Sequence, residues 1–175
     1  DLLDIAIKQS ADLLVGDFLR LTDEQIAGGK YDVCHGDSIT VKSGYELYLE
    51  DLNPHECYVW RILYRRDFLL ERCLSFIRHR FCFEDIPFTL ECILHANRCI
   101  KCKASFYLYI HRDNSIVTKV DKHKLYDINV VINYLWGVKK QRNNSKEFME
   151  RMTDLLFNTF SFYSCHRCLS DPHAI

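Results

Sequence analysis

Residues 83–111, FEDIPFTLECILHANRCIKCKASFYLYIH, carry the two clearest secondary-structure signals in the sequence. Pro87 suits the first turn of a helix, and the apolar side chains after it predict a helix that continues to about Asn97. From residue 100 to residue 111 apolar and polar side chains alternate, which predicts a strand with one buried face. A helix that leads directly into such a strand favours an α/β fold.

The rest of the chain also alternates between helix and strand patterns. Ser43 and Glu46 have the spacing of a capping box, which predicts a short helix that ends near Leu52. Further elements are expected as an uncapped helix at residues 2–7, a buried strand at 13–21, a loop or irregular hairpin at 22–37, a strand at 58–63, a helix at 65–74, and two closing helices with apolar positions at 125–135 and 148–160, the second capped by Asn144. The predicted class is therefore α/β.

Composition excludes several functional classes. The chain has 175 residues, which suits one domain, and its 23 basic and 24 acidic side chains leave a net charge of −1. A nucleic-acid-binding protein would normally show a marked basic excess, so nucleic acid is not expected as a partner. Nine cysteines are too few for a secreted disulfide scaffold, where about 8–10% is typical. We therefore expect reduced thiols that fill gaps in the core.

The neighbouring carboxylates Glu84 and Asp85 are the strongest candidates for chemistry. They stand at the expected start of a helix, where the helix dipole favours negative charge. An ordinary aspartate, with a pKa of about 3.9, is ionised at neutral pH and can accept a proton from an attacking hydroxyl. An acidic pair before a helix is more often a cap, so the residues alone leave both interpretations open.

Four motifs, in the same order, resemble the downstream half of bacterial family-2 glycosyltransferases. They are ADLLVGD at residues 11–17, WRILYRRDFL at 60–69, FEDIPFT at 83–89 and YIHRDNSI at 109–116. The resemblance covers roughly residues 1–120 and implies a partial GT-A fold, a mixed sheet flanked by helices. Residues 121–175 would then form a C-terminal helical extension. Members of this family are inverting enzymes that build cell-surface polysaccharides.

The resemblance also implies roles for individual residues. Asp85 would be the general base that deprotonates an acceptor hydroxyl, and Glu84 would orient the acceptor or the base. Arg112 would lie near the donor pyrophosphate, and His111 would lie beside it or help to hold a metal. Trp60 offers a flat face on which a sugar ring can stack. Core packing for Trp60, a surface ion pair for Arg112 and a solvent-facing position for His111 remain the alternatives.

One family signature is missing from this sequence. The family binds a divalent metal, Mn or Mg, through a D-x-D motif that precedes the matched region, but no two aspartates here are two positions apart. The expected metal ligands are therefore unknown. The family's "WxK" lysine is replaced by Arg61. We expect the chain to correspond to the acceptor-side part of the enzyme and to be inactive alone.

The same resemblance implies the partners and the location. The donor would be a nucleotide-sugar, and the acceptor a glycan or a lipid-linked glycan. The first residues lack the features of a signal peptide, so a cytoplasmic location is expected. Basic residues at 139–146 would either touch the anionic inner membrane face or belong to a solvated loop.

Two rival functions compete with this interpretation. Cys99 and Cys102 form one C-x-x-C pair, and Cys165 and Cys168 form another, which suggests a metal-binding or redox module. Residues 103–164 separate the pairs, whereas a zinc ribbon spaces them by about 15–20 residues. The other rival is a non-catalytic interaction domain that has only the shape of a glycosyltransferase.

Overall fold

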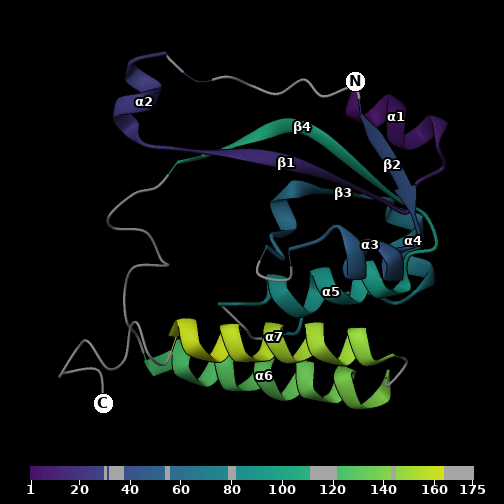
Figure 1. The fold of residues 1–175 in the computed structure, drawn as a ribbon, viewed down its shortest axis with the longest axis vertical. Helices are drawn as coiled ribbons and strands as arrows, with labels where there is room; N and C mark the ends of the chain where they lie inside the picture. Colours follow the sequence, from purple (N-terminus) through teal and green to yellow (C-terminus); the bar gives the residue numbers. More distant parts are fainter. Residues whose placement is uncertain are drawn as a thin grey trace.

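A computed structural model describes residues 1–29, 31, 38–53, 56–78, 82–110, 122–142 and 145–163. Its centre is a four-stranded mixed sheet in the order β2-β4-β1-β3 (Figure 1). The strands are β1 (Leu13–Leu21), β2 (Ile39–Lys42), β3 (Ile62–Tyr64) and β4 (Cys99–Ile110). The two long strands, β1 and β4, are parallel, and both outer strands pair antiparallel to them. The predicted α/β class with a mixed sheet is confirmed.

Helices form two layers beneath the sheet. The upper layer contains α3 (Gly44–Glu50) and α5 (Asp85–His95), and the lower layer is the pair α6 (Lys122–Gln141) and α7 (Lys146–Tyr163) (Figure 1). The short helices are α1 (Leu2–Lys8), α2 (Asp23–Ala27), α4 (Arg66–Glu71) and the 3-10 turn η1 (Val59–Arg61). None of the described helices combines the length and the apolar character that a bilayer crossing needs.

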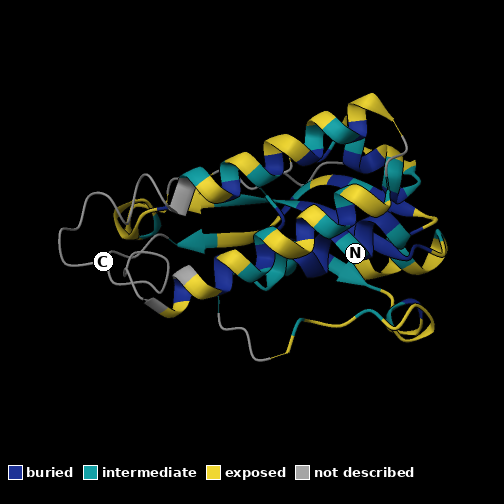
Figure 2. Cartoon of the chain, turned by 90° about the horizontal axis from the view of Figure 1, so that it is seen from below, coloured by how far each residue is buried: buried dark blue, intermediate teal, exposed yellow. Residues whose placement is uncertain are grey.

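The main core lies between the sheet and these helices. It contains side chains from both long strands and from all four helices of the two layers, and buried residues gather between the layers in Figure 2. Its largest fully buried members are Leu13, Val15, Leu47, Tyr48, Leu90, Ile93, Leu135, Phe148, Met152 and Leu155. A smaller core on the other face joins α1 to Leu14, Ile100 and Cys102. The closing helices thus share the core of the sheet, while the expected boundary at residue 120 stays a prediction.

Several local predictions are confirmed. The strand at residues 13–21 is β1, and α3 begins at a complete Ser43–Glu46 capping box. The helix of the FEDIPFT motif is α5, and the alternating segment after it is β4. Local signals of this kind depend on near neighbours in sequence, so they do not need tertiary context.

The burial of β4 differs from the prediction. We expected the even-numbered side chains to lie in the core along the whole strand, yet Phe106 and Leu108 are exposed. Near the start of β4 both faces are buried, because Cys99 belongs to the main core and Ile100 to the core under α1. Among the described residues, β2 pairs with residues 99–102, and the second half of β4 pairs with β1 alone.

Other elements were missed or misplaced. Residues 22–37 include the helix α2, β2 was not predicted, and the expected strand at 58–63 begins instead as η1. Asp1 caps α1 through a capping box, contrary to the expected uncapped start. Phe160, the last of the apolar positions that predicted the closing helix, is exposed. The expected cap Asn144 lies outside the described residues.

Candidate active site

Asp85 is the first residue of α5, and a sharp turn places it there. Phe83 has a φ of 62°, a left-handed conformation that bulky side chains rarely adopt. Glu84 occupies the N-cap position, but in the described part of the chain its side chain makes no capping hydrogen bond. The acidic pair therefore does not cap the helix through Glu84. Strain of this kind costs about 1–3 kcal/mol and often accompanies a functional site.

The carboxylate of Asp85 is held in an unusual electrostatic state. The side chain is half-buried, and burial raises its pKa to about 6, with the Glu84 charge as the second cause. The backbone N–H groups of Ile86 and Asp85 itself lower the pKa in part. Among the described residues no cation forms an ion pair with this carboxylate. It is therefore a stronger base than a solvated aspartate and is still ionised at neutral pH.

The charge of Asp85 acts on the pKa of three side chains from other segments. Cys57 and Tyr58 precede η1, and Tyr64 ends β3. Burial is the main cause that raises the pKa of each, to about 12 for Cys57, and the negative charge of Asp85 adds to all three shifts. The start of α5 therefore faces the segment around η1 and β3.

Arg61 fixes this segment to the sheet. Its guanidinium is buried and donates to the backbone carbonyl of Gly16 at 2.9 Å, to Glu56 at 2.7 Å and to Asp17 at 3.2 Å. Two carboxylates thus balance one buried cation, which is the arrangement that a buried charge requires. Arg61 holds η1 on β1, so its charge is already compensated by the protein.

Trp60 lies in a cluster of aromatic rings, which we call the aromatic cluster. The indole is stacked with Tyr107 at 4.2 Å and with Tyr58 at 4.9 Å between ring centroids. Tyr109 stacks at 5.6 Å, and Phe18 meets the indole edge-on. Trp60 is half-buried and outside the main core, so simple core packing does not describe it. Its contact with a sugar stays a prediction.

The structure brings Asp85 and Trp60 to the same region. Trp60 belongs to η1, and η1 contacts α5, the helix that begins at Asp85. Tyr58, which precedes η1, stacks on Trp60. His111 and Arg112, which directly follow the end of β4, lie outside the described residues. Their proposed roles at the donor pyrophosphate stay predictions.

The comparisons with known proteins found matches among solved structures only. No family model matches the chain, and no curated protein matches it. Two crystal structures of residues 1–349 of TarS, a glycosyltransferase from S. aureus, do match. The first aligns over 99% of this chain and 45% of that chain, with a TM-score of 0.58 and 14% identity. The fold is glycosyltransferase-like.

The second match is the same TarS segment in complex with UDP. It aligns over 95% of this chain and 44% of that chain, with a TM-score of 0.55 and 14% identity. At this identity the likeness establishes the fold alone. The chain with the glycosyltransferase-like fold therefore spans less than half of the TarS segment.

The structure separates the first cysteine pair of the metal-binding alternative. Cys99 belongs to the main core and Cys102 to the core under α1, so the sheet separates the two thiols. No group of three metal-ligating side chains occurs among the described residues. Cys165 and Cys168 lie outside the described part of the chain. Cys99 and Cys102 therefore do not form one metal site.

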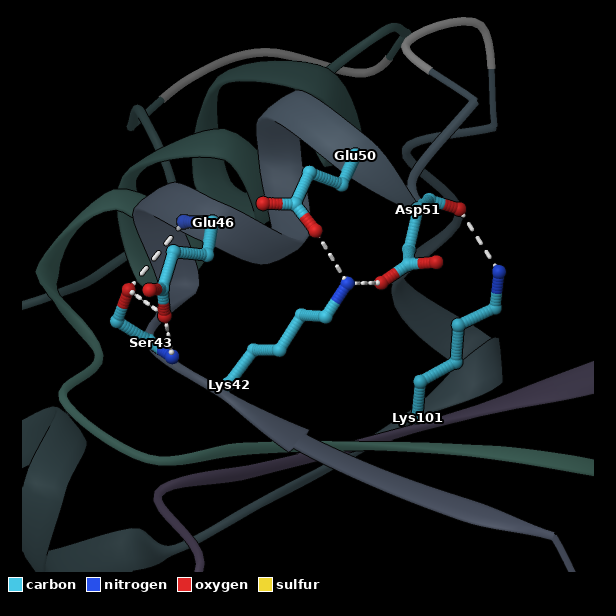
Figure 3. Close-up of polar contacts among 6 residues, drawn as sticks. All are labelled: Lys42, Ser43, Glu46, Glu50, Asp51 and Lys101. Carbon is cyan, nitrogen blue, oxygen red and sulfur yellow. Dashed lines mark hydrogen bonds and ion pairs between the residues drawn. The ribbon is translucent and has the colours of Figure 1, made fainter.

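A second charged cluster, centred on Lys42, is structural in the glycosyltransferase-like fold. Its ammonium pairs with Glu50 at 2.6 Å and also with Asp51, whose backbone carbonyl accepts from Lys101 at 2.8 Å (Figure 3). Figure 3 also shows the Ser43 cap at the start of α3. These contacts join β2, α3 and β4, and they satisfy the Lys42 charge.

Sequence reasoning missed two hydroxyls close to the candidate base. Tyr64 lies in the WRILYRRDFL motif, and Thr89 follows Asp85 by four residues in FEDIPFT. Residues four apart share one face of a helix, so the position of Thr89 was accessible from the sequence. The position of Tyr64 was not, because it depends on the packing of β3 against α5.

Proposed function

We propose that the chain is the acceptor-side part of an inverting family-2 glycosyltransferase in which Asp85 is the general base. The observation that carries the proposal is the Asp85 carboxylate at the start of α5, half-buried and without a cation partner among the described residues. The glycosyltransferase-like fold supports it.

The reaction assigned to this site is sugar transfer to a hydroxyl. The acceptor oxygen attacks the anomeric carbon of the donor, the bond from that carbon to the nucleoside diphosphate breaks, and Asp85 takes the acceptor proton. Attack from the face opposite the leaving group inverts the configuration at the anomeric carbon. Glu84 would orient the acceptor next to Asp85.

The raised pKa of Asp85 suits this role. A general base works best when its pKa is near the operating pH, since it must be ionised and still bind a proton well. With a pKa of about 6, Asp85 is mostly ionised at pH 7.5 and is a better proton acceptor than an ordinary aspartate. Burial and the Glu84 charge together raise the pKa of Asp85 to this range.

A nucleotide-sugar is the proposed donor, and a glycan or lipid-linked glycan is the proposed acceptor. The TarS segment that shares this fold was solved with UDP, which supports a uridine nucleotide-sugar. The divalent metal that the family resemblance implies, Mn or Mg, finds no ligand group among the described residues, and the steps above involve none. His111 and Arg112 remain the proposed contacts to the diphosphate.

The proposed setting is cell-surface polysaccharide synthesis at the cytoplasmic face of the inner membrane. One surface supports a peripheral contact: Trp136 is exposed, and the ammonium groups of Lys139 and Lys140 lie 5.3 Å and 5.4 Å from the centroid of its ring. An indole with flanking cations suits the interface of an anionic membrane.

The test compares Asp85→Asn with Asp67→Asn in the complete gene product that carries this chain. Asp67 is exposed in the first turn of α4 and is the matched control. Loss of a general base lowers turnover by about 10²–10⁴-fold, so we expect this loss for Asp85→Asn and less than a twofold change for Asp67→Asn. Near-normal turnover of a folded Asp85→Asn variant would remove Asp85 from the base role.

A further inference from the structure

Four apolar side chains lie exposed on two neighbouring strands of the sheet. They are Ile39 and Val41 of β2 and Phe106 and Leu108 of β4, and each is between 37% and 40% exposed. Single exposed apolar side chains are ordinary, but a group of them on adjacent strands marks an interaction surface. We call these four residues the exposed sheet face.

The two side chains of β2 point to the side of the sheet that carries α1. Ile39 pairs with Cys102 across the strands, and Val41 pairs with Ile100. Residues directly opposite each other on paired strands share a face of the sheet. Since Cys102 and Ile100 belong to the core under α1, Ile39 and Val41 lie on that same face.

The two side chains of β4 lie on this face as well. A Cβ atom added at Gly16 would meet the Phe106 ring at 2.0 Å, so the ring covers the Gly16 side of β1. Gly16 follows Leu14 by two residues and shares its face, and Leu14 belongs to the core under α1. Leu108 shares the face of Phe106 through the same alternation along β4.

The second half of β4 also has an open edge in the described part of the chain. β4 pairs with β2 through residues 99–102 and with β1 as far as Ile110, so residues 103–110 have a neighbouring strand on one side. The unpaired backbone groups of such an edge readily accept another strand. Sheets with parallel strands are usually buried on both faces, which the exposed sheet face is not.

The comparison with TarS indicates what occupies these surfaces. The match aligns over 45% of the TarS segment, so more than half of that segment has no counterpart in this chain. The opposite face of the sheet is already filled, because α3, α5, α6 and α7 pack there in the main core (Figure 1). The face of α1 and the open edge of β4 are therefore the surfaces left for the remainder of such a fold.

We propose that the exposed sheet face and the edge at residues 103–110 dock the remaining part of the glycosyltransferase-like fold in the complete gene product. That part adds a strand beside β4 and buries the four apolar side chains. The inference rests on the proposed function in one respect, that this chain is part of a larger enzyme. Tyr107 and Tyr109 of the aromatic cluster alternate with the exposed side chains along β4, so the docked part borders the candidate site.

The first test compares side-chain accessibility in this chain and in the complete gene product. In hydroxyl-radical footprinting read by mass spectrometry, we expect oxidation of Phe106 and Leu108 to fall several-fold in the complete gene product. Phe157, an exposed ring of α7, is the control and should be oxidised equally in both. Amide hydrogen exchange should slow more at residues 103–110 than at residues 99–102, which are already paired on both sides.

Two footprinting results would overturn the proposal. One is equal oxidation of Phe106 and Leu108 in this chain and in the complete gene product. The other is protection that already appears in this chain alone and grows with its concentration, because the occupant would then be a second copy.

The second test uses a charge on the exposed sheet face. Leu108→Lys should lower the melting temperature of the complete gene product by about 5–10 °C, because the docked part would bury an unpaired ammonium. In this chain alone the same change should stay within about 2 °C, as should the control Phe157→Lys in both proteins. Leu108→Ser should act in the same direction by less and serves if Leu108→Lys does not fold. An equal effect of the Leu108 variants in both proteins overturns the proposal.

Turnover of Asp85→Asn separates this inference from the proposed function. If the exposed sheet face is protected in the complete gene product while Asp85→Asn keeps its turnover, the proposed base fails and the docking surface stands. Loss of turnover in Asp85→Asn with the face still accessible in the complete gene product overturns the docking surface and supports the proposed function.

Discussion

The Nε atom of Arg61 donates a 2.9 Å hydrogen bond to the backbone carbonyl of Gly16, which ties the segment facing Asp85 to the central strand β1. The same guanidinium pairs with Glu56 and Asp17 and is only 3% exposed. Removing one partner of such a buried network leaves the remaining charges uncompensated. The segment next to the start of α5 is thus held on the sheet by a salt-bridge network that does not include Asp85.

Arg61→Ala is expected to lower the free energy of unfolding by about 3–5 kcal/mol, measured by urea denaturation. Arg61→Lys should cost less, because an ammonium retains the charge but loses the geometry of three separate donors. Arg66→Ala, at an exposed position in α4, is the control and should stay within about 0.5 kcal/mol of wild type. A loss below about 1 kcal/mol for Arg61→Ala would show that the network does not hold this segment.

Gly44 and Gly137 should respond to alanine in opposite directions. A Cβ atom at Gly44 would lie 1.6 Å from the backbone carbonyl oxygen of Ile93, which cannot move without α5. Overpacking costs about 1–3 kcal/mol, and a backbone clash belongs at the upper end of that range. Gly137 lies inside α6 with open space around it, so alanine there should stabilise by about 0.5–1 kcal/mol. Equal effects in thermal unfolding would contradict the close contact between α3 and α5.

Asp85→Asn should stabilise the fold at neutral pH. The pKa of Asp85 rises from 3.8 to about 6 on folding, so the folded state holds the proton more tightly than the unfolded chain. That stabilisation is complete below pH 3.8 and is lost as the pH rises through about 6. Asparagine resembles the protonated form, and at pH 7.5 we expect it to gain about 1–3 kcal/mol in the free energy of unfolding.

The pH dependence is the control within this experiment. The advantage of Asp85→Asn over wild type should vanish near pH 4, since both side chains are then neutral in the folded state. Urea denaturation at the two pH values gives both numbers. A variant that is no more stable than wild type at pH 7.5 would mean that Asp85 is not destabilised by burial.

The aromatic cluster should contribute to acceptor binding if Trp60 has the expected role. Tyr107 is 37% exposed and stacks on Trp60, so Tyr107→Ala removes an accessible ring without opening the main core. We expect kcat/KM for the acceptor to fall about 5–30-fold, the loss that corresponds to about 1–2 kcal/mol of ring contact. Phe157→Ala, at an exposed ring of α7 outside the cluster, should leave it unchanged.

A direct optical test of Trp60 is also available, because the chain contains two tryptophans. With Trp136→Phe, Trp60 becomes the single indole reporter. Oligosaccharide acceptors should change its fluorescence in this chain, whereas the donor nucleotide alone should not. No change at acceptor concentrations that support turnover would place Trp60 outside the acceptor site.

The parts of the fold that the sequence predicted are those with local signals. The Ser43–Glu46 cap, the apolar residues of β1 and the start of α5 depend on neighbours within a few residues. β2 lacked such a signal: it has four residues and pairs with residues 99–102, far away in the chain. Short edge strands of this kind are specified by tertiary contact.

The same distinction applies to the site. Asp85 and Trp60 could be selected because they lie inside recognisable motifs, and Thr89 could have been found by its spacing from Asp85. The role of Arg61 could not, because its partners Gly16 and Asp17 precede it by more than forty residues. Tyr64 required the contact between β3 and α5. Burial of polar groups is a tertiary property, so the sequence alone did not reveal it.

The dependence of kcat/KM on pH in the complete gene product tests the central claim most directly. If Asp85 is the general base, kcat/KM falls tenfold per pH unit below an apparent pKa of about 6, and this limb disappears from the residual activity of Asp85→Asn. A wild-type profile that stays flat from pH 7.5 to pH 4.5, or an unchanged acid limb in Asp85→Asn, would contradict the role of Asp85 as the base.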